Sequence, residues 1–143
     1  MSETLPTAVF HKMMEKDAFS QWLGIELIEI AAGYCKLEMT VRPEMLNGFG
    51  MLHGGVTFAF ADSAFAFASN SHGRLSVSQN GSMTYAKPAT AGDRLIAEAT
   101  QLTLGHKTAT FDVKVFEKET EKIIAFFRGS VYRTSKEVLA ENT

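Results

Sequence analysis

The stretch from Asn47 to Ser71 most constrains the fold, because it joins a glycine-rich turn to a helix that is apolar on nearly every side. Between Val56 and Ala68 the residues are Phe, Ala, Val or Thr, apart from Asp62 and one serine. A helix that is apolar all round is normally buried, so we expect the rest of the chain to enclose it. A buried carboxylate must find partners or shift its pKa, which makes Asp62 a candidate functional group.

The helix begins at Gly54 and Gly55, whose lack of side chains leaves the first backbone N–H groups uncovered. These groups have no partner within the helix, and the helix dipole adds to their attraction for negative charge. Such an end can bind an anion or polarise a carbonyl oxygen in a reaction that develops an oxyanion. The alternative is that the glycines only permit a tight turn, while Asp62 meets a buried arginine or a backbone donor.

The spacing of these two features predicts a dimer. Gly54 and Asp62 are eight positions apart, so Asp62 lies about 12 Å along the axis from the helix start. One small reacting group cannot touch both. If they share a site, the acid must come from a second copy of the helix running alongside in the opposite direction, and a symmetric dimer supplies that arrangement.

Composition narrows the class of protein. The 143 residues are 45% hydrophobic, which fits one globular domain spanning residues 1–143, and the net charge of −2 with no dominant basic run argues against nucleic acid as a partner. A single cysteine, Cys35, excludes an intrachain disulfide and suits a reducing compartment. The first ten residues do not resemble a signal peptide, and residues 56–68 are too short to span a bilayer. We therefore expect a cytoplasmic protein without a membrane partner.

Hydrophobic periodicity predicts an α+β architecture. The segment 7–22 has helical spacing and is followed by Gly24 as a stop signal, so we expect an N-terminal capping helix there. Strands in sequence order joined by short turns imply antiparallel pairing around the buried helix. The strands are expected at 25–31, 34–42, 75–86, 94–104, 108–117 and 123–132, with a polar, frayed tail at 135–143.

A series of short motifs together resembles a known family. Asn47 is followed by the triplet HGG at 53–55, by Ala61-Asp62, and then by AFAxAxNSxG and TYxKPAxxGD. This string is similar to that of the hotdog-fold acyl-CoA thioesterases of the phenylacetic-acid degradation (PaaI-type) family, from about Phe19 to Tyr132. The resemblance implies a long helix wrapped by an antiparallel sheet and a homodimer with two sites that assembles further into a homotetramer. It implies no cofactor, since coenzyme A is part of the substrate.

The resemblance also implies roles for particular residues. Gly54 matches the backbone N–H that polarises the thioester carbonyl, and Asn47 matches a residue that assists it. Asp62 matches the catalytic carboxylate, which acts from the partner subunit on water as a general base or on the thioester itself as a nucleophile. These three residues form the expected catalytic set.

A second set is expected to contact substrate, namely His53, Gly55 and Ser78. His53 could act as a general base, as in hotdog dehydratases, but its place beside the glycine turn favours bracing of that loop. Ser78 lies seven positions before Tyr85, where some relatives place a hydroxyl that orients the attacking water; the alternative is a strand serine facing solvent or a neighbouring strand. The four histidines show no paired ligand spacing, so no metal site is expected.

The sequence predicts less about the identity of the substrate. The four phenylalanines of the central helix are compatible with an aromatic acyl group, or they form the core: Phe58, Phe60, Phe65 and Phe67. Three basic residues are candidate contacts for the coenzyme A phosphates, although charges at strand ends are most often solvated: Lys107, Arg128 and Arg133.

The sequence therefore favours hydrolysis of an acyl-CoA thioester, with an aryl-acetyl or hydroxylated phenylacetyl type of acyl group. Two alternatives remain open at this point, a hotdog dehydratase or hydratase acting on a thioester and a non-catalytic acyl-CoA-binding regulatory module. The acid expected in the buried helix argues against the binding module. The lack of a second acid or histidine deeper in the helix argues against the dehydratase.

Overall fold

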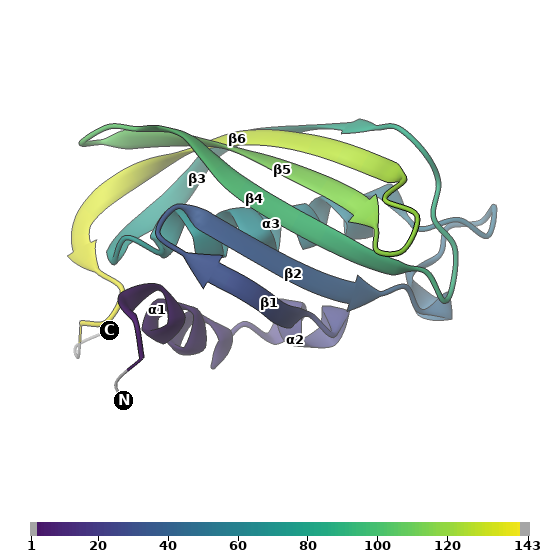
Figure 1. Ribbon diagram of the computed structural model, residues 1–143, viewed down its shortest axis with the longest axis horizontal. Helices are drawn as coiled ribbons and strands as arrows, with labels where there is room; N and C mark the ends of the chain where they lie inside the picture. The colour runs from purple at the N-terminus through teal and green to yellow at the C-terminus, as the bar shows by residue number, and fades with distance from the viewer. Residues whose placement is uncertain (1–2, 141–143) are drawn as a thin grey trace.

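Within residues 3–140, which this computed structural model describes, a six-stranded antiparallel sheet curves around one long helix, α3 (Gly54–Asn70) (Figure 1). Two shorter helices lie on the side of the molecule where β1 and β2 run (Figure 1). The other elements are α1 (Leu5–Met14), α2 (Ala18–Leu23), β1 (Glu26–Ala31), β2 (Tyr34–Thr40), a 3-10 turn (Pro43–Met45), β3 (Arg74–Tyr85), β4 (Arg94–Leu104), β5 (Thr108–Glu117) and β6 (Ile123–Glu137).

The order of strands across the sheet differs from their order along the chain. It runs β1-β2-β4-β5-β6-β3, and β3 pairs with β6 rather than with β4. The expectation that neighbouring strands in sequence would pair was therefore wrong for β3. The reason is that α3 carries the chain along the sheet to its far edge, and residues 86–93 must then return it to β4. All five pairings are antiparallel, as predicted.

The core lies between α3 and the concave face of the sheet. Phe65 packs against Phe111 and Phe127, with ring centroids 5.9 and 5.2 Å apart. Phe60, Phe65 and Phe67 are at most 1% exposed, so their burial stabilises the fold by about 1.5–3 kcal/mol each. These three rings do not line an acyl cavity. Of the four helix phenylalanines, only Phe58 is half-buried.

The N-terminal segment forms two helices rather than the single helix predicted at 7–22. Asp17 leaves helical geometry, with φ −86° and ψ 78°, and its side chain caps α2 by accepting from the Ser20 backbone N–H at 3.0 Å. A capping aspartate starts a new helix, because it replaces the hydrogen bond that a preceding turn would have made. Gly24 ends α2 in the left-handed conformation, where the stop was expected.

One face of α3 is left uncovered by its own chain. Gly55, Ala59, Asp62 and Ala66 recur at helical spacing and are exposed or half-buried, and we refer to them as the open face of α3. The β3 strand lies at an edge of the sheet, paired on one side only among residues 3–140.

The C-terminal end is more ordered than expected, since β6 continues to Glu137 and Val138 is 8% exposed. The rest of the tail predicted at 135–143 includes residues 141–143, which lie outside the described residues. Among residues 3–140, no helix is both long and apolar enough to cross a membrane.

Candidate active site

The turn before α3 is anchored at both of its ends. Leu46 and Leu52 form an isolated antiparallel bridge, and the Leu52 N–H donates to the Ala89 carbonyl at 2.7 Å. The His53 N–H donates to the Met45 carbonyl at 2.9 Å. These backbone contacts fix the position at which α3 begins.

Among the described residues, the helix start offers one backbone donor without an acceptor. His53 is the N-cap, and its Nδ1 accepts from the Gly55 N–H at 2.9 Å. The expectation that both glycine N–H groups would be uncovered was therefore wrong for Gly55, because the preceding histidine folds back over it. The N–H groups of Val56 and Thr57 donate to the His53 carbonyl. Among residues 3–140, the Gly54 N–H has no acceptor.

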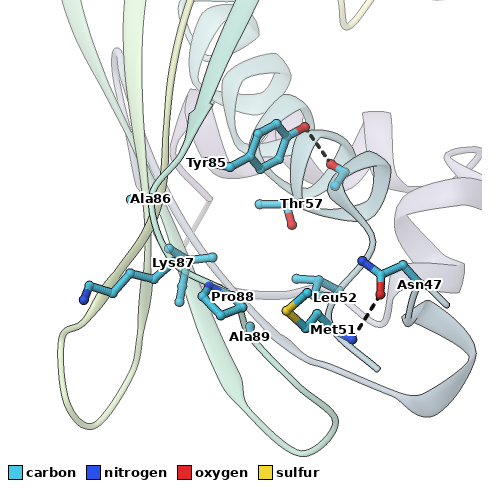
Figure 2. A pocket seen from close by; sticks show the side chains of 11 residues that line it. Asn47, Met51, Leu52, Thr57, Tyr85, Ala86, Lys87, Pro88 and Ala89 are labelled. Carbon is cyan, nitrogen blue, oxygen red and sulfur yellow. Dashed lines mark hydrogen bonds between the residues drawn. The ribbon is translucent and has the colours of Figure 1, made fainter. Parts of the chain in front are cut away.

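Asn47 is oriented by the turn that contains it. Its side-chain Oδ1 accepts from the backbone N–H groups of Phe49 at 2.8 Å and Met51 at 3.2 Å. Because both neighbours are donors, the oxygen must face the turn, and the amide NH₂ is turned toward the adjacent cavity (Figure 2). Asn47 is thus a turn residue that also presents a donor.

A cavity of about 370 Å³ lies where Asn47 and Gly54 meet the end of β3. Its lining includes Thr57 from the first turn of α3, Tyr85 from the end of β3, and the following residues 86–89 (Figure 2). The Tyr85 hydroxyl donates to the Gly54 carbonyl at 2.9 Å. Neither Thr57 nor Tyr85 was expected as a site residue from the sequence, although Tyr85 lies within the TYxKPAxxGD motif.

Asp62 is not buried in its own chain, contrary to expectation. It lies on the open face of α3 and is exposed, because the concave sheet covers only the other faces of the helix. Neighbouring protein atoms nevertheless displace part of its water, and this desolvation, with the negative charge of Asp17, raises the pKa of Asp62 above its usual range. Asp62 does not line the cavity that contains Asn47 and Gly54.

Ser78 lies on the helix side of β3. It pairs with Val131, which is 1% exposed and points into the core, so the two residues share the concave face. Ser78 itself is exposed in the single chain and is not part of the cavity. The predicted site residues thus divide into two groups, one at the helix start and one along the open face and edge strand.

The thioesterase superfamily sequence profile matches residues 49–124, a segment that includes Gly54, Asp62 and Tyr85. A relative that is 37% identical covers almost the whole chain. This chain belongs to the thioesterase superfamily. The relative is Acyl-coenzyme A thioesterase PaaI of Escherichia coli, and the match spans 92% of this chain and 93% of that protein.

Two solved structures agree with the fold described above. The structure of the Escherichia coli PaaI protein from the phenylacetic acid degradation operon has a TM-score of 0.90, with 93% of this chain and 96% of that chain covered at 35% identity. A Streptococcus mutans protein bound to acetyl CoA has a TM-score of 0.76 at 25% identity, covering 79% of this chain and 90% of that one. These matches confirm the predicted hotdog fold.

Another relative is human Acyl-coenzyme A thioesterase 13. It is 34% identical over 82% of this chain and 86% of its own length. The chain is therefore similar to both a bacterial and a human protein that carry the name of an acyl-CoA thioesterase.

Of the three basic residues that were candidate phosphate contacts, Lys107 and Arg133 are neighbours, since the Arg133 N–H donates to the Lys107 carbonyl at 2.7 Å. Arg128 donates twice to Asp112, at 2.6 and 2.9 Å, which leaves it neutralised on the outer face of the sheet. Arg133 donates to the Gly105 carbonyl at 2.6 Å, and Lys107 is exposed. Within residues 3–140, no cluster of three or more His, Cys, Asp or Glu residues could hold a metal ion.

Proposed function

We propose that this superfamily member hydrolyses acyl-CoA thioesters to the free acid and coenzyme A, with an aryl-acetyl group as the preferred acyl group. One observation carries the proposal: two donors, the Gly54 N–H and the Asn47 NH₂, border the same cavity without an acceptor among residues 3–140. Two donors that border one cavity at a helix start are suited to the oxyanion that forms when a thioester carbonyl is attacked.

The proposed enzyme is a dimer in which two α3 helices lie side by side in opposite directions. The open face of α3 supports this arrangement, because Gly55, Ala59 and Ala66 are small enough to permit close approach of a second helix. The edge of β3 supports it too. This strand is twelve residues long, lacks proline and lysine, and exposes Leu75 and Val77. An edge strand with these features can pair with a strand of another chain.

In that dimer each site combines two chains. Since Asp62 lies about 12 Å along α3 from Gly54, the carboxylate opposite the helix start is Asp62 of the partner subunit. Desolvation that raises the pKa of Asp62 makes it a better proton acceptor from water. Ser78, on the helix side of the edge strand, orients that water. We further propose that two such dimers form a homotetramer.

The reaction follows from these positions. Asp62 of the partner subunit takes a proton from water as the water oxygen adds to the thioester carbonyl carbon, and the resulting oxyanion accepts from Gly54 and Asn47. Collapse of this intermediate breaks the C–S bond, and the departing sulfur receives the proton held by the carboxyl group. Direct attack by the carboxylate, giving an anhydride that water then cleaves, uses the same residues.

The contact made by His53 argues against a dehydratase that uses this histidine as its base. Its Nδ1 is occupied by the Gly55 N–H, so the neutral ring carries its proton on Nε2. A ring in that state has no free lone pair with which to remove a proton. A substrate contact for His53 would therefore be made by donation from Nε2.

The preference for an aryl-acetyl group rests on similarity to a protein of a phenylacetic acid degradation operon. The half-buried Phe58, beside the open face of α3, would supply an aromatic contact in the dimer.

Because the single thiol, Cys35, is fully buried, we also propose that the enzyme works in the reducing cytoplasm, where disulfides are rare.

The test is a panel of coenzyme A esters with release of free thiol followed over time. Phenylacetyl, hydroxyphenylacetyl, benzoyl, hexanoyl, palmitoyl and acetyl esters should all be compared by kcat/KM, and the aryl-acetyl esters should be highest. No thiol release from any ester would overturn the proposed hydrolysis. Hydration of crotonyl-CoA without thiol release would instead identify a hydratase.

A further inference from the structure

We infer that Tyr85 is a positioning residue for the thioesterase reaction: it holds the first peptide group of α3 so that the Gly54 N–H stays directed at the thioester carbonyl. This inference rests on the proposed function. Tyr85 would not touch the reacting atoms in this role. It would act through the backbone that does.

The peptide group between Gly54 and Gly55 is held at both of its polar atoms. Its carbonyl oxygen accepts from the Tyr85 hydroxyl at 2.9 Å (Figure 2). Its N–H donates to Nδ1 of His53, also at 2.9 Å. A peptide group is planar, so two hydrogen bonds on opposite edges restrict its rotation. The preceding peptide group, which carries the Gly54 N–H, is fixed in turn.

Both glycines are explained by these two contacts. A Cβ added at Gly54 would lie 3.3 Å from the Cε1, Cζ and hydroxyl oxygen of Tyr85, and one added at Gly55 would lie 3.0 Å from Nδ1 of His53. Such distances are shorter than ordinary van der Waals contact. The two glycines of the HGG triplet therefore allow a tyrosine ring and an imidazole to pack closely against the backbone, in addition to leaving backbone groups exposed.

The tyrosine connects the helix start to the β-sheet. Tyr85 is the last residue of β3, and the next residue, Ala86, donates to the Ile124 carbonyl at 2.8 Å. The hydroxyl thus ties the helix to the sheet, whereas the His53 cap is internal to the turn. Donors that stabilise an oxyanion are effective because they are held in place before the reaction, and this tether provides that restraint.

A hydrogen bond to the Gly54 carbonyl also strengthens the donor at the other end of the same peptide group, because hydrogen bonds in a chain polarise one another. The run from Tyr85 through the Gly54–Gly55 peptide to His53 is such a chain. Loss of the hydroxyl should therefore remove the hydrogen bond at the Gly54 carbonyl and also weaken the one from the Gly55 N–H to His53.

The test compares Tyr85→Phe with the control Tyr132→Phe. Tyr132 is also partly exposed, at 41%, and its hydroxyl makes no hydrogen bond within residues 3–140. With the best coenzyme A ester, Tyr85→Phe should lower kcat by about 10-fold, less than the 10²–10³ of a directly lost donor, while KM changes less than twofold. Tyr132→Phe should match the wild type. Tyr85 is 54% exposed, so both variants should fold and melt like the wild type.

A spectroscopic measurement separates positioning from a general structural effect. A substrate analogue in which CH₂ replaces the thioester sulfur cannot be hydrolysed, and a ¹³C label at its carbonyl reports polarisation by the Gly54 N–H. The bound carbonyl resonance should lie downfield of the free one in wild type and Tyr132→Phe, and return part of the way in Tyr85→Phe. A wild-type kcat and a bound resonance at the wild-type position in Tyr85→Phe would refute the inference while leaving the hydrolysis intact. If the wild type itself releases no thiol, the proposed function fails instead.

Discussion

The hydroxyl oxygens of Ser20 and Ser63 lie 2.8 Å apart and form a buried hydrogen bond between α2 and α3. Ser63 is the neighbour of Asp62 in sequence, and Ser20 also donates to the Asp17 carboxylate at 2.6 Å. This contact fixes a second carboxylate close to the proposed catalytic acid. The negative charge of Asp17 adds to desolvation in raising the pKa of Asp62.

Replacing Asp17 by Asn should lower the pH at which activity is lost in acid. Asn caps a helix as well as Asp does, so α2 should stay in place while the repulsion of the Asp62 carboxylate is removed. The proposed mechanism requires ionised Asp62, so the acid limb of the kcat/KM profile should move to lower pH. The movement should be modest, since desolvation is the larger cause. An unchanged acid limb in a fully folded variant would show that Asp17 does not influence the catalytic acid.

Asp62→Asn should lower kcat by about 10²–10⁴, because it removes the proton acceptor at nearly constant size. The same substitution should not lower the stability of the fold at neutral pH. The folded pKa of Asp62 is raised, so its contribution to stability is present below the unfolded pKa and is lost as pH rises through the folded pKa. At neutral pH the variant should therefore melt at the same or a higher temperature than wild type. The difference should vanish in acid, where both forms are neutral. A large fall in melting temperature would make Asp62 a structural residue.

Asn47 can be tested with two variants that differ in what they preserve. Asn47→Ala removes the cavity-facing donor and also the acceptor that holds the Phe49 and Met51 N–H groups. Asn47→Asp keeps that acceptor, but it replaces the donor by a carboxylate whose negative charge also opposes an oxyanion. Asn47→Ala should lower kcat by about 10²–10³, the usual cost of one oxyanion donor, and Asn47→Asp should lower it at least as much. Weaker substrate binding with unchanged kcat would assign Asn47 to recognition.

The native protein should not react with thiol reagents. Cys35 is 0% exposed, and burial raises its pKa to about 12, so almost no thiolate is present at neutral pH. Ellman's reagent should titrate no protein thiol in buffer and one per chain after denaturation. Coenzyme A released in the activity assay is then the sole source of signal. Rapid labelling of the folded protein would contradict the burial of this residue.

Local sequence patterns predicted several elements closely. Alternation of apolar and polar residues placed β4 at 94–104 and β5 at 108–117, as observed, because each strand has one face on the core. The break at Asp17 was missed, since an aspartate there also fits the polar face of a continuous helix. The pairing of β3 with β6 was missed because it joins segments about fifty residues apart and no local signal encodes it.

The candidate site shows a similar division. A glycine pair after a histidine and an isolated acid on an apolar helix were enough to propose Gly54 and Asp62 as site residues. The exposure of Asp62 in the single chain could not be predicted. A helix face that is covered by a second chain has the same apolar sequence pattern as a face that is covered by the chain's own sheet. The contact of Tyr85 with the Gly54 carbonyl depends on where β3 ends relative to α3, which is a property of the tertiary fold.

The central claim is that each active site uses two chains, and co-expression of two inactive variants tests it most directly. Asn47→Ala and Asp62→Ala chains with different tags allow the mixed dimer to be purified, with each variant paired to itself as the control. One site of the mixed dimer then has both residues intact and the other has neither. Two-fold symmetry predicts recovery of about half the wild-type activity per dimer. A mixed dimer as inactive as its parents would show that Asn47 and Asp62 act within one chain.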